Sequence, residues 1–198
     1  YRSLVCSDGL IDFASNDYLG FARKSILGEG SNNLHGATGS RLISGNSPEA
    51  ERAEKKIASF HRTQAALIFN SGYLANIGLC SAIAGKNDTF ICDELIHVSL
   101  LDGIRLSFAG RLKFKHNAIA DQEKKLKKAQ GNKFVMVESL YSMDGDEAPL
   151  KEMVEVCEQH KAHLIVDEAH ATGVWGEQGE GLVCQLRLEE KVLARIYT

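Results

Sequence analysis

The stretch Val166-Asp167-Glu168-Ala169-His170-Ala171-Thr172-Gly173 decides the fold of this chain. The apolar run Leu164-Ile165-Val166 leads into it and predicts a buried strand of a parallel sheet. The strand ends in an acid, and a histidine follows three residues later. Because ligands of open α/β sheets bind just beyond the carboxyl ends of the strands, Asp167 and His170 are candidate site residues.

Two kinds of site would suit this stretch. In a cofactor site, Asp167 and His170 would hold an aromatic ring, whereas in a nucleotide-hydrolysing site of the DEAH type the acid would hold magnesium. The second kind also needs the phosphate loop G-x-x-x-x-G-K-[ST], but Gly85-Lys86 is followed by Asn87. A dinucleotide fingerprint is equally weak, because Gly28-Glu29-Gly30 is followed by Asn33 where a glycine is needed. The ring-binding interpretation is therefore favoured.

Composition narrows the class of protein further. The chain has 198 residues with 44% hydrophobic and 25% charged residues and a net charge of −3, as in ordinary globular proteins. The basic run Lys124-Lys125-Leu126-Lys127-Lys128 predicts a solvated helix face rather than a nucleic-acid patch. Five scattered cysteines without C-x-x-C spacing suggest reduced thiols. With no apolar run near the roughly 18 residues of a membrane span and no visible signal peptide, we expect a cytoplasmic protein without nucleic-acid or membrane partners.

Strand-like and helix-like patterns alternate along the chain, which predicts an α/β fold with a mostly parallel sheet and helices on both faces. We expect residues 1–45 to form an N-terminal segment with a glycine-rich loop, and residues 46–198 to form the domain built on the sheet. We expect a helix to begin at Ser47-Pro48. Its buried face should be formed by Ala53, Ile57, Ala58 and Phe60. Strands are expected at 10–14, 65–69, 89–93, 111–114, 134–138, 164–166 and from 192, and the other helices at 73–84, 97–108, 119–129 and 149–161.

Further candidates lie where strands end. The turn Asn70-Ser71-Gly72-Tyr73 precedes a helix, whose free N–H groups suit a phosphate, although a plain turn would look the same. Asp167 could keep a ring nitrogen protonated or could be a structural cap. His97 opens a helix after the strand ending in Asp93 and could stack on a planar ring. His97, Asp167 and His170 lack metal-ligand spacing such as H-E-x-x-H, so no metal is expected.

Six motifs together resemble the α-oxoamine synthase family of fold-type I pyridoxal-phosphate enzymes. They occur in the family's order and span nearly the whole chain. Within the family, residues 142–150 and 173–179 are most similar to the 8-amino-7-oxononanoate synthases of biotin synthesis. The motifs are Asn16-Asp17-Tyr18-Leu19-Gly20, Gly36-Ala37-Thr38-Gly39-Ser40-Arg41-Leu42-Ile43-Ser44-Gly45, Asn70-Ser71-Gly72-Tyr73, Asp93-Glu94-Leu95-Ile96-His97-Val98-Ser99, Ser142-Met143-Asp144-Gly145-Asp146 with Ala148-Pro149-Leu150, and Asp167-Glu168-Ala169-His170-Ala171-Thr172-Gly173 with Gly176-Glu177-Gln178-Gly179.

The resemblance implies a fold-type I large domain that binds pyridoxal 5'-phosphate. In such a site Asp167 would pair with the ring nitrogen and His97 would stack on the ring and help to place the substrate. Ser142 and His170 would bond the ring's phenolic oxygen or its surroundings. The residues expected to hold the phosphate are Gly72, Tyr73 and Thr198, the last often from the partner subunit's side of a dimer interface.

The resemblance also implies a reaction and partners. The expected activity is a decarboxylative condensation of L-alanine with pimeloyl-CoA, or the pimeloyl carrier protein, to give 8-amino-7-oxononanoate. Catalytic roles would belong to His97, Asp167 and His170, with Asn16 near the amino-acid substrate. A homodimer with a shared active site is expected, with the loop around Arg41 at its interface near the acyl-CoA entrance. The alternatives are another α-oxoamine synthase, such as glycine C-acetyltransferase or serine palmitoyltransferase, and a non-catalytic homologue.

One departure from the family's pattern concerns the lysine that forms the Schiff base. In the family it follows the matching threonine by three residues, whereas this sequence ends at Thr198, and Lys191 does not match the motif. We therefore expect the sequence to be part of a longer protein that carries the lysine and a C-terminal domain.

Overall fold

The computed structural model describes residues 39–43 and 45–198. The chain divides into two compact units, residues 1–46 and 47–198. In the first unit, the guanidinium of Arg41 donates to Asn46 Oδ1 from Nε (3.0 Å) and Nη2 (2.8 Å). Asn16 and the strand expected at 10–14 lie outside the described residues, so those expectations stay untested.

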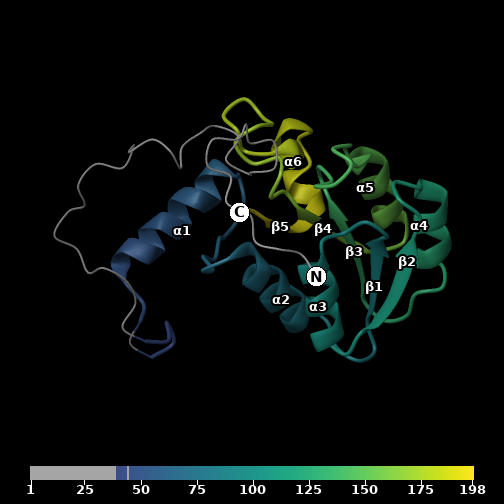
Figure 1. The fold of residues 1–198 in the computed structure, drawn as a ribbon, viewed down its shortest axis with the longest axis horizontal. Helices are drawn as coiled ribbons and strands as arrows, with labels where there is room; N and C mark the ends of the chain where they lie inside the picture. Colours follow the sequence, from purple (N-terminus) through teal and green to yellow (C-terminus); the bar gives the residue numbers. More distant parts are fainter. Residues whose placement is uncertain (1–38, 44) are drawn as a thin grey trace, which may run out of the picture. The chain divides into compact units, whose positions relative to one another are not determined.

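The second unit is built on a parallel sheet of five strands in the order β2-β1-β3-β4-β5 (Figure 1). The register pairs Asp93 with Phe114 and Glu138 with Asp167, so the strands finish at one common edge. Apolar residues fill β1, β3 and β4 because helices cover both faces of the sheet. The strands are β1 (Thr89–Asp93), β2 (Gly110–Phe114), β3 (Lys133–Glu138), β4 (His163–Asp167) and β5 (Val192–Ile196).

Two hydrophobic clusters lie on opposite faces of the sheet, as the alternation of side chains along a strand requires. Phe90 and Cys92 pack with the helices α2 (Gly72–Ile83) and α3 (Val98–Leu106). Ile91 instead belongs to the cluster under α4, α5 and α6. The predicted α/β fold with helices on both faces is thus confirmed. The remaining helices are α1 (Pro48–Phe60), α4 (Ile119–Leu126), α5 (Leu150–Gln159), α6 (Leu182–Gln185) and the short η1 (Glu189–Lys191).

The helix starts follow from side-chain caps. Ser47 Oγ accepts from Ala50 N (3.1 Å), and Pro48 occupies the first turn of α1, as predicted. Ser71 Oγ accepts from Leu74 N (3.2 Å) and so begins α2 directly after the turn that was expected to face a phosphate. This start leaves the backbone N–H groups of the first turn without partners inside the helix.

Two expectations about local packing are wrong. In α1 the predicted stripe is buried only at Ala58, while Ile57 and Phe60 are 36% and 41% exposed, because none of the other described helices and strands makes extensive contact with α1. Residues 65–69 form no strand, because none of the described strands pairs with them. The Ile68 N–H instead donates to Glu54 Oε1 (2.9 Å).

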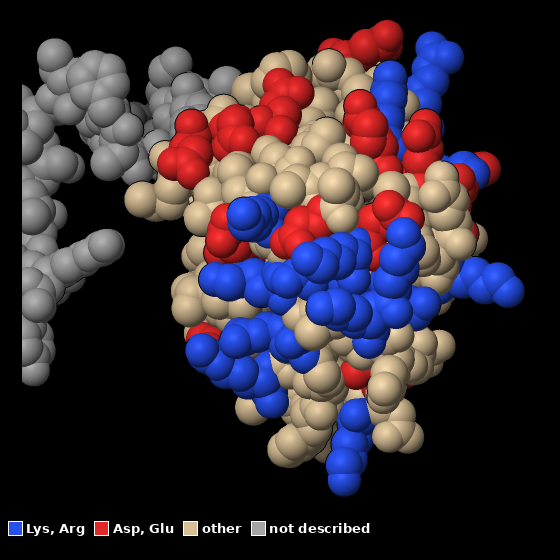
Figure 2. Space-filling view, turned by 90° about the vertical axis from the view of Figure 1, so that its right-hand side faces the viewer, with Lys and Arg blue, Asp and Glu red and all other residues tan. Residues whose placement is uncertain are grey.

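Lys and Arg side chains gather in a band on the face that looks out beyond β2 and α4 (Figure 2). Two lysines of the basic run are paired with acids of the same helix, Lys125 with Asp121 (3.9 Å) and Lys127 with Glu123 (2.7 Å). Such i,i+4 pairs are typical of a solvated helix face.

The four described cysteines are free and buried. Among the described residues, the helices are too short or too polar to pass through a bilayer.

Candidate active site

Three neighbouring strands end in buried acids at the same edge of the sheet. Asp93 ends β1, Glu138 ends β3 and Asp167 ends β4, and their exposed fractions are 1%, 2% and 6%. Asp93 is held by the Leu95 N–H (2.9 Å) and the Asn117 N–H (2.9 Å). Three carboxyl groups brought together in a buried place concentrate negative charge where a cationic or protonated ligand group would be bound well.

The pKa of Glu138 is raised at this edge of the sheet. Burial, and next the negative charge of Asp167, raise the pKa of Glu138 from 4.5 to about 7, against the lowering effect of the Ser142 N–H that donates to its Oε2 (3.3 Å). Its Oε1 is buried without a hydrogen-bond partner. Glu138 is therefore a carboxyl group that can hold or release a proton near neutral pH.

Asp167 is joined to His97 through two buried side chains. Asn76, on α2, donates from Nδ2 to Asp167 Oδ2 (3.0 Å) and to Ser99 Oγ (2.9 Å). Ser99, on α3, lies with its Oγ 2.6 Å from His97 Nδ1. The predicted strand-end acid and the predicted helix-start histidine thus belong to one hydrogen-bonded chain that crosses β4, α2 and α3.

Gly72 and Thr198 lie in contact at the start of α2. A Cβ built on Gly72 would lie 1.9 Å from Thr198 Cγ2, so any larger residue at position 72 would require the threonine side chain to move. The contact brings the threonine hydroxyl side chain to the same helix start as the N–H groups of Gly72 and Tyr73. A helix start with free N–H groups and a nearby threonine has the donors that a phosphate needs.

The remaining candidates lie around the same edge. Tyr73 turns its hydroxyl to Asp102 Oδ2, to which it donates. Ser142 is an exposed residue of the turn after β3, and its backbone N–H is already bonded to Glu138. His170 is half-buried in the turn after β4. The roles suggested for Ser142, His170 and Asn16 stay predictions.

The sequence analysis missed Asn76, Ser99 and Glu138. Glu138 had a readable signal, because like Asp93 and Asp167 it ends an apolar strand in an acid. Asn76 also stood out as the one amide in the apolar helix sequence of α2. Ser99 ends the motif that begins at Asp93, but a serine in the first turn of a helix is common and suggests no role by itself.

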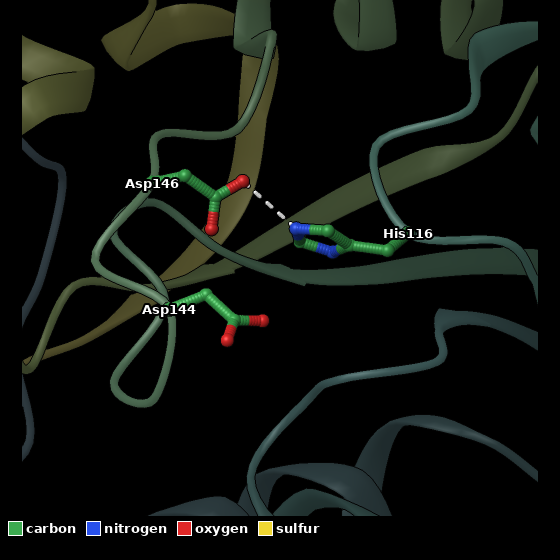
Figure 3. Close-up of side chains that lie close together, drawn as sticks. All are labelled: His116, Asp144 and Asp146. Carbon is green, nitrogen blue, oxygen red and sulfur yellow. Dashed lines mark hydrogen bonds and ion pairs between the residues drawn. The ribbon is translucent and has the colours of Figure 1, made fainter.

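A second cluster near this edge has the composition of a cation site. His116, Asp144 and Asp146 have ligand atoms within 4.8 Å of one another (Figure 3). His116, however, donates from both ring nitrogens, to Asp93 Oδ1 (3.0 Å) and Asp146 Oδ2 (2.8 Å). Burial lowers the pKa of His116, but these two carboxylates outweigh it and raise the pKa above 6.5. When protonated, His116 bridges the two acids and has no nitrogen lone pair for a metal.

A cavity of about 550 Å³ lies at the opposite end of the strands. It is lined by Thr89 and Gly110, the first residues of β1 and β2, and by Lys86, Arg111 and Lys128. Because it faces the amino ends of the strands, it is separate from the acids and histidines described above.

Known proteins are similar to this chain in sequence. Residues 8–194 match the family Aminotransferase class I and II. A putative 8-amino-7-oxononanoate synthase of Bacillus licheniformis is 45% identical over 189 residues, which cover 91% of this chain and 50% of the relative. The 8-amino-7-oxononanoate synthase of Emericella nidulans is 42% identical over 212 residues, covering 95% and 52%. The chain spans about half the length of the curated relatives it matches.

Solved structures agree with this similarity. Sphingomonas wittichii serine palmitoyltransferase matches with a TM-score of 0.76 and 40% identity, covering 79% of this chain and 40% of that one. The 8-amino-7-oxononanoate synthase from Francisella tularensis matches with a TM-score of 0.74 and 27% identity, covering 94% and 54%. The family is one of pyridoxal-phosphate enzymes, and a serine palmitoyltransferase structure with pyridoxal phosphate is among the matches. The chain belongs to the aminotransferase class I and II family and, within it, to the α-oxoamine synthases.

Proposed function

We propose that this protein is a pyridoxal-phosphate-dependent acyltransferase that condenses L-alanine with a pimeloyl thioester to give 8-amino-7-oxononanoate. The observation that carries the proposal is the chain of contacts from Asp167 through Asn76 and Ser99 to His97, beside the Gly72–Thr198 contact. A ring-binding acid, a flat imidazole and a phosphate-binding helix start then lie along one edge of the sheet. The curated relatives at 42–45% identity support the choice of substrates.

The residues present fit the cofactor. Gly72 leaves the helix start free of a side chain, and Thr198 occupies the space that a Cβ would take. Their shared surface would hold the phosphate through the N–H groups of Gly72 and Tyr73 and the Thr198 hydroxyl. Asp167 keeps a carboxylate at the strand end, where it would accept a hydrogen bond from a protonated ring nitrogen.

When bound, pyridoxal phosphate supplies an electron sink for negative charge at the Cα atom of the amino acid. The residues of this chain would act around that sink. Asp167 would hold the proton on the ring nitrogen, which would keep the ring electron-poor. His97 would stack on the ring and help to orient the substrate, while Ser142 and His170 would act on the phenolic oxygen or its surroundings. The Schiff-base lysine expected for the family is not among these residues.

The reaction balances without a further reagent. The Cα–H bond of alanine breaks, its electron pair forms the bond to the thioester carbonyl carbon, and the C–S bond breaks as the leaving thiolate takes up a proton to become the free thiol. The bond from Cα to the alanine carboxylate then breaks to release CO₂, and a proton returns to Cα. We include in the proposal a homodimer with a shared active site, which native mass spectrometry of the protein would test.

A second candidate is condensation of L-serine with palmitoyl-CoA. It rests on the serine palmitoyltransferase structure, which is 40% identical and covers 79% of this chain, whereas the curated relatives at 42–45% identity favour the first candidate. The two candidates use the same residues at the cofactor and differ in amino acid and acyl chain. Glycine with acetyl-CoA is the third pair to compare.

The test is to offer the protein each pair and to measure free thiol and product mass. We expect thiol release with L-alanine and pimeloyl-CoA and a product of the mass of 8-amino-7-oxononanoate. Release only with another pair would reassign the substrate, and no release with any pair would favour a non-catalytic homologue. Asp167→Asn should lower turnover by about 10²–10³-fold, the usual cost of one electrostatic stabiliser. Near-normal turnover of that variant would contradict the role given to Asp167.

A further inference from the structure

Asn76 lies on α2 and bonds Ser99 on α3 and Asp167 at the end of β4, two residues of the proposed cofactor site. Its side chain is buried, at 3% exposure, and Ser99 is fully buried. The Asn76 amide spans residues far apart in sequence, to Ser99 on α3 and to Asp167 at the end of β4. A buried amide that bonds two functional elements at once is well suited to set their positions.

The hydrogen bonds of this chain run outward from the Asn76 NH₂ group, to Asp167 on one side and to Ser99 on the other. A carboxylate only accepts hydrogen bonds, so Asn76 turns its NH₂ group toward Asp167 Oδ2, and the same group reaches Ser99 Oγ. With Ser99 Oγ accepting from Asn76, its own proton is free to point at His97 Nδ1, 2.6 Å away. The Ser99 N–H also faces Nδ1, at 3.3 Å. Nδ1 is therefore an acceptor, and the proton of a neutral His97 lies on Nε2.

We propose that Asn76 and Ser99 are positioning residues that fix the Asp167 carboxylate and the His97 tautomer together. Asp167 Oδ1 accepts from the Ala169 N–H (3.0 Å), so with Asn76 on Oδ2 both oxygens are held and the carboxylate plane is set. The imidazole is set in turn by Ser99. We call the hydrogen-bonded chain Asp167–Asn76–Ser99–His97 the relay. Its effect on the cofactor rests on the function proposed above, whereas the relay itself does not.

The relay is tested first without cofactor, by the ¹⁵N chemical shifts of His97 in the histidine-labelled protein. In Ser99→Ala, Nδ1 keeps only the longer contact from the backbone, so we expect the Nδ1 shift to move and the Nε2–H tautomer to lose population. Ser99→Thr, which keeps the hydroxyl, should retain the wild-type pattern. Ser107→Ala is the matched control, because Ser107 is also a buried serine, directly after the same helix, and bonds Ile104 O instead. Unchanged His97 shifts in Ser99→Ala, or equal changes in Ser107→Ala, would overturn the relay.

The second measurement is the affinity for pyridoxal phosphate, followed by protein fluorescence. Asn76→Ala should weaken binding about tenfold, the effect of losing one hydrogen bond to a charged group. Gln122→Ala is the control, since Gln122 is a fully buried amide on α4 with weak contacts to Met153 O and Cys157 Sγ at 3.5 Å. Thermal melts confirm that each variant is folded before titration.

Coupling between the two positions separates a relay from two independent effects. The variant with both Asn76→Ala and Ser99→Ala should lose less affinity than the product of the two single losses, because each substitution breaks the same chain. Independent, multiplying losses would contradict joint positioning. If the wild-type protein binds no pyridoxal phosphate, the proposed function fails, and the histidine shifts still decide the relay.

Discussion

Glu138 and Asp167 lie opposite each other in the register of β3 and β4, with both carboxyl groups buried at the same edge of the sheet. Two buried acids at neighbouring positions resist being ionised together, which is why the pKa of Glu138 rises to about 7 through burial and the charge of Asp167. The folded protein therefore carries an energetic cost at this edge that depends on pH.

We predict that Glu138→Gln stabilises the protein at alkaline pH but not at acidic pH. Because the folded-state pKa of about 7 exceeds the ordinary 4.5, the folded state binds more protons between these values, and stability falls as pH rises through that window. The cost above the window is roughly 3–4 kcal/mol, at about 1.4 kcal/mol for each pH unit between the two pKa values. Urea unfolding at acidic and alkaline pH measures it. Glu155→Gln, an exposed position on α5, is the control. An equal effect of Glu138→Gln at both pH values would contradict the prediction.

We predict that Gly72→Ala destabilises the start of α2 and weakens cofactor binding, and that Thr198→Ser relieves both effects. The new Cβ would meet Thr198 Cγ2 at 1.9 Å, whereas the Thr198 Cβ is 3.2 Å away and serine lacks the methyl group. Overpacking of this kind costs roughly 1–3 kcal/mol. Unfolding of the two single variants and the double variant measures the coupling. Additive effects in the double variant would mean that the two residues do not touch.

We predict that Gly103→Ala separates α2 from α3. A Cβ at Gly103 would lie 2.8 Å from Asn76 O and 2.8 Å from Cys80 Cβ, both on the facing helix. The overlap should cost about 1–3 kcal/mol, offset in part by the better helix propensity of alanine. Gly85→Ala is the control, since its Cβ would meet only Asp88 Oδ2 at 3.9 Å. A thermal melt of each variant suffices, and equal melting temperatures would argue against the close helix contact.

We predict that His116 stabilises the fold more at acidic than at alkaline pH. Its pKa is raised above 6.5 by Asp93 and Asp146 against the effect of burial, so its contribution is complete below about 6.5 and is lost as pH rises through the folded value. The loss in His116→Gln should be on the order of 1 kcal/mol at acidic pH and smaller at alkaline pH. His163→Gln is the comparison, because that exposed ring stacks on Phe134 instead. A pH-independent loss would contradict the ion-pair interpretation.

Local signals in the sequence were enough to locate most elements of the fold. Ser47-Pro48 begins α1, and the apolar runs that end in Asp93, Glu138 and Asp167 are strands, because caps and buried parallel strands depend on neighbouring residues. Residues 65–69 have the same apolar character but form no strand among the described residues, since a strand needs a hydrogen-bonded neighbour that composition does not reveal.

The site was also predictable in part. Asp167 and His97 follow from their places after strands, and the structure joins them in one chain of contacts. The joining residues Asn76 and Ser99 acquire their importance only when α2 packs on α3, at a position where Gly103 permits close approach. Packing between helices joins residues that are far apart in the sequence, so motifs taken one at a time do not identify Asn76 and Ser99.

The strand β2 forms one edge of the described sheet and has a consequence for association between molecules. It carries the exposed Arg111 and Lys113. The face of the molecule beyond β2 and α4 shows a band of Lys and Arg side chains (Figure 2). A strand edge offers unpaired backbone groups to any other chain, and charged side chains there are a common protection. A second copy that added its β2 to this edge would bring cations against cations, so the repulsion should keep this side of the sheet from templating aggregates.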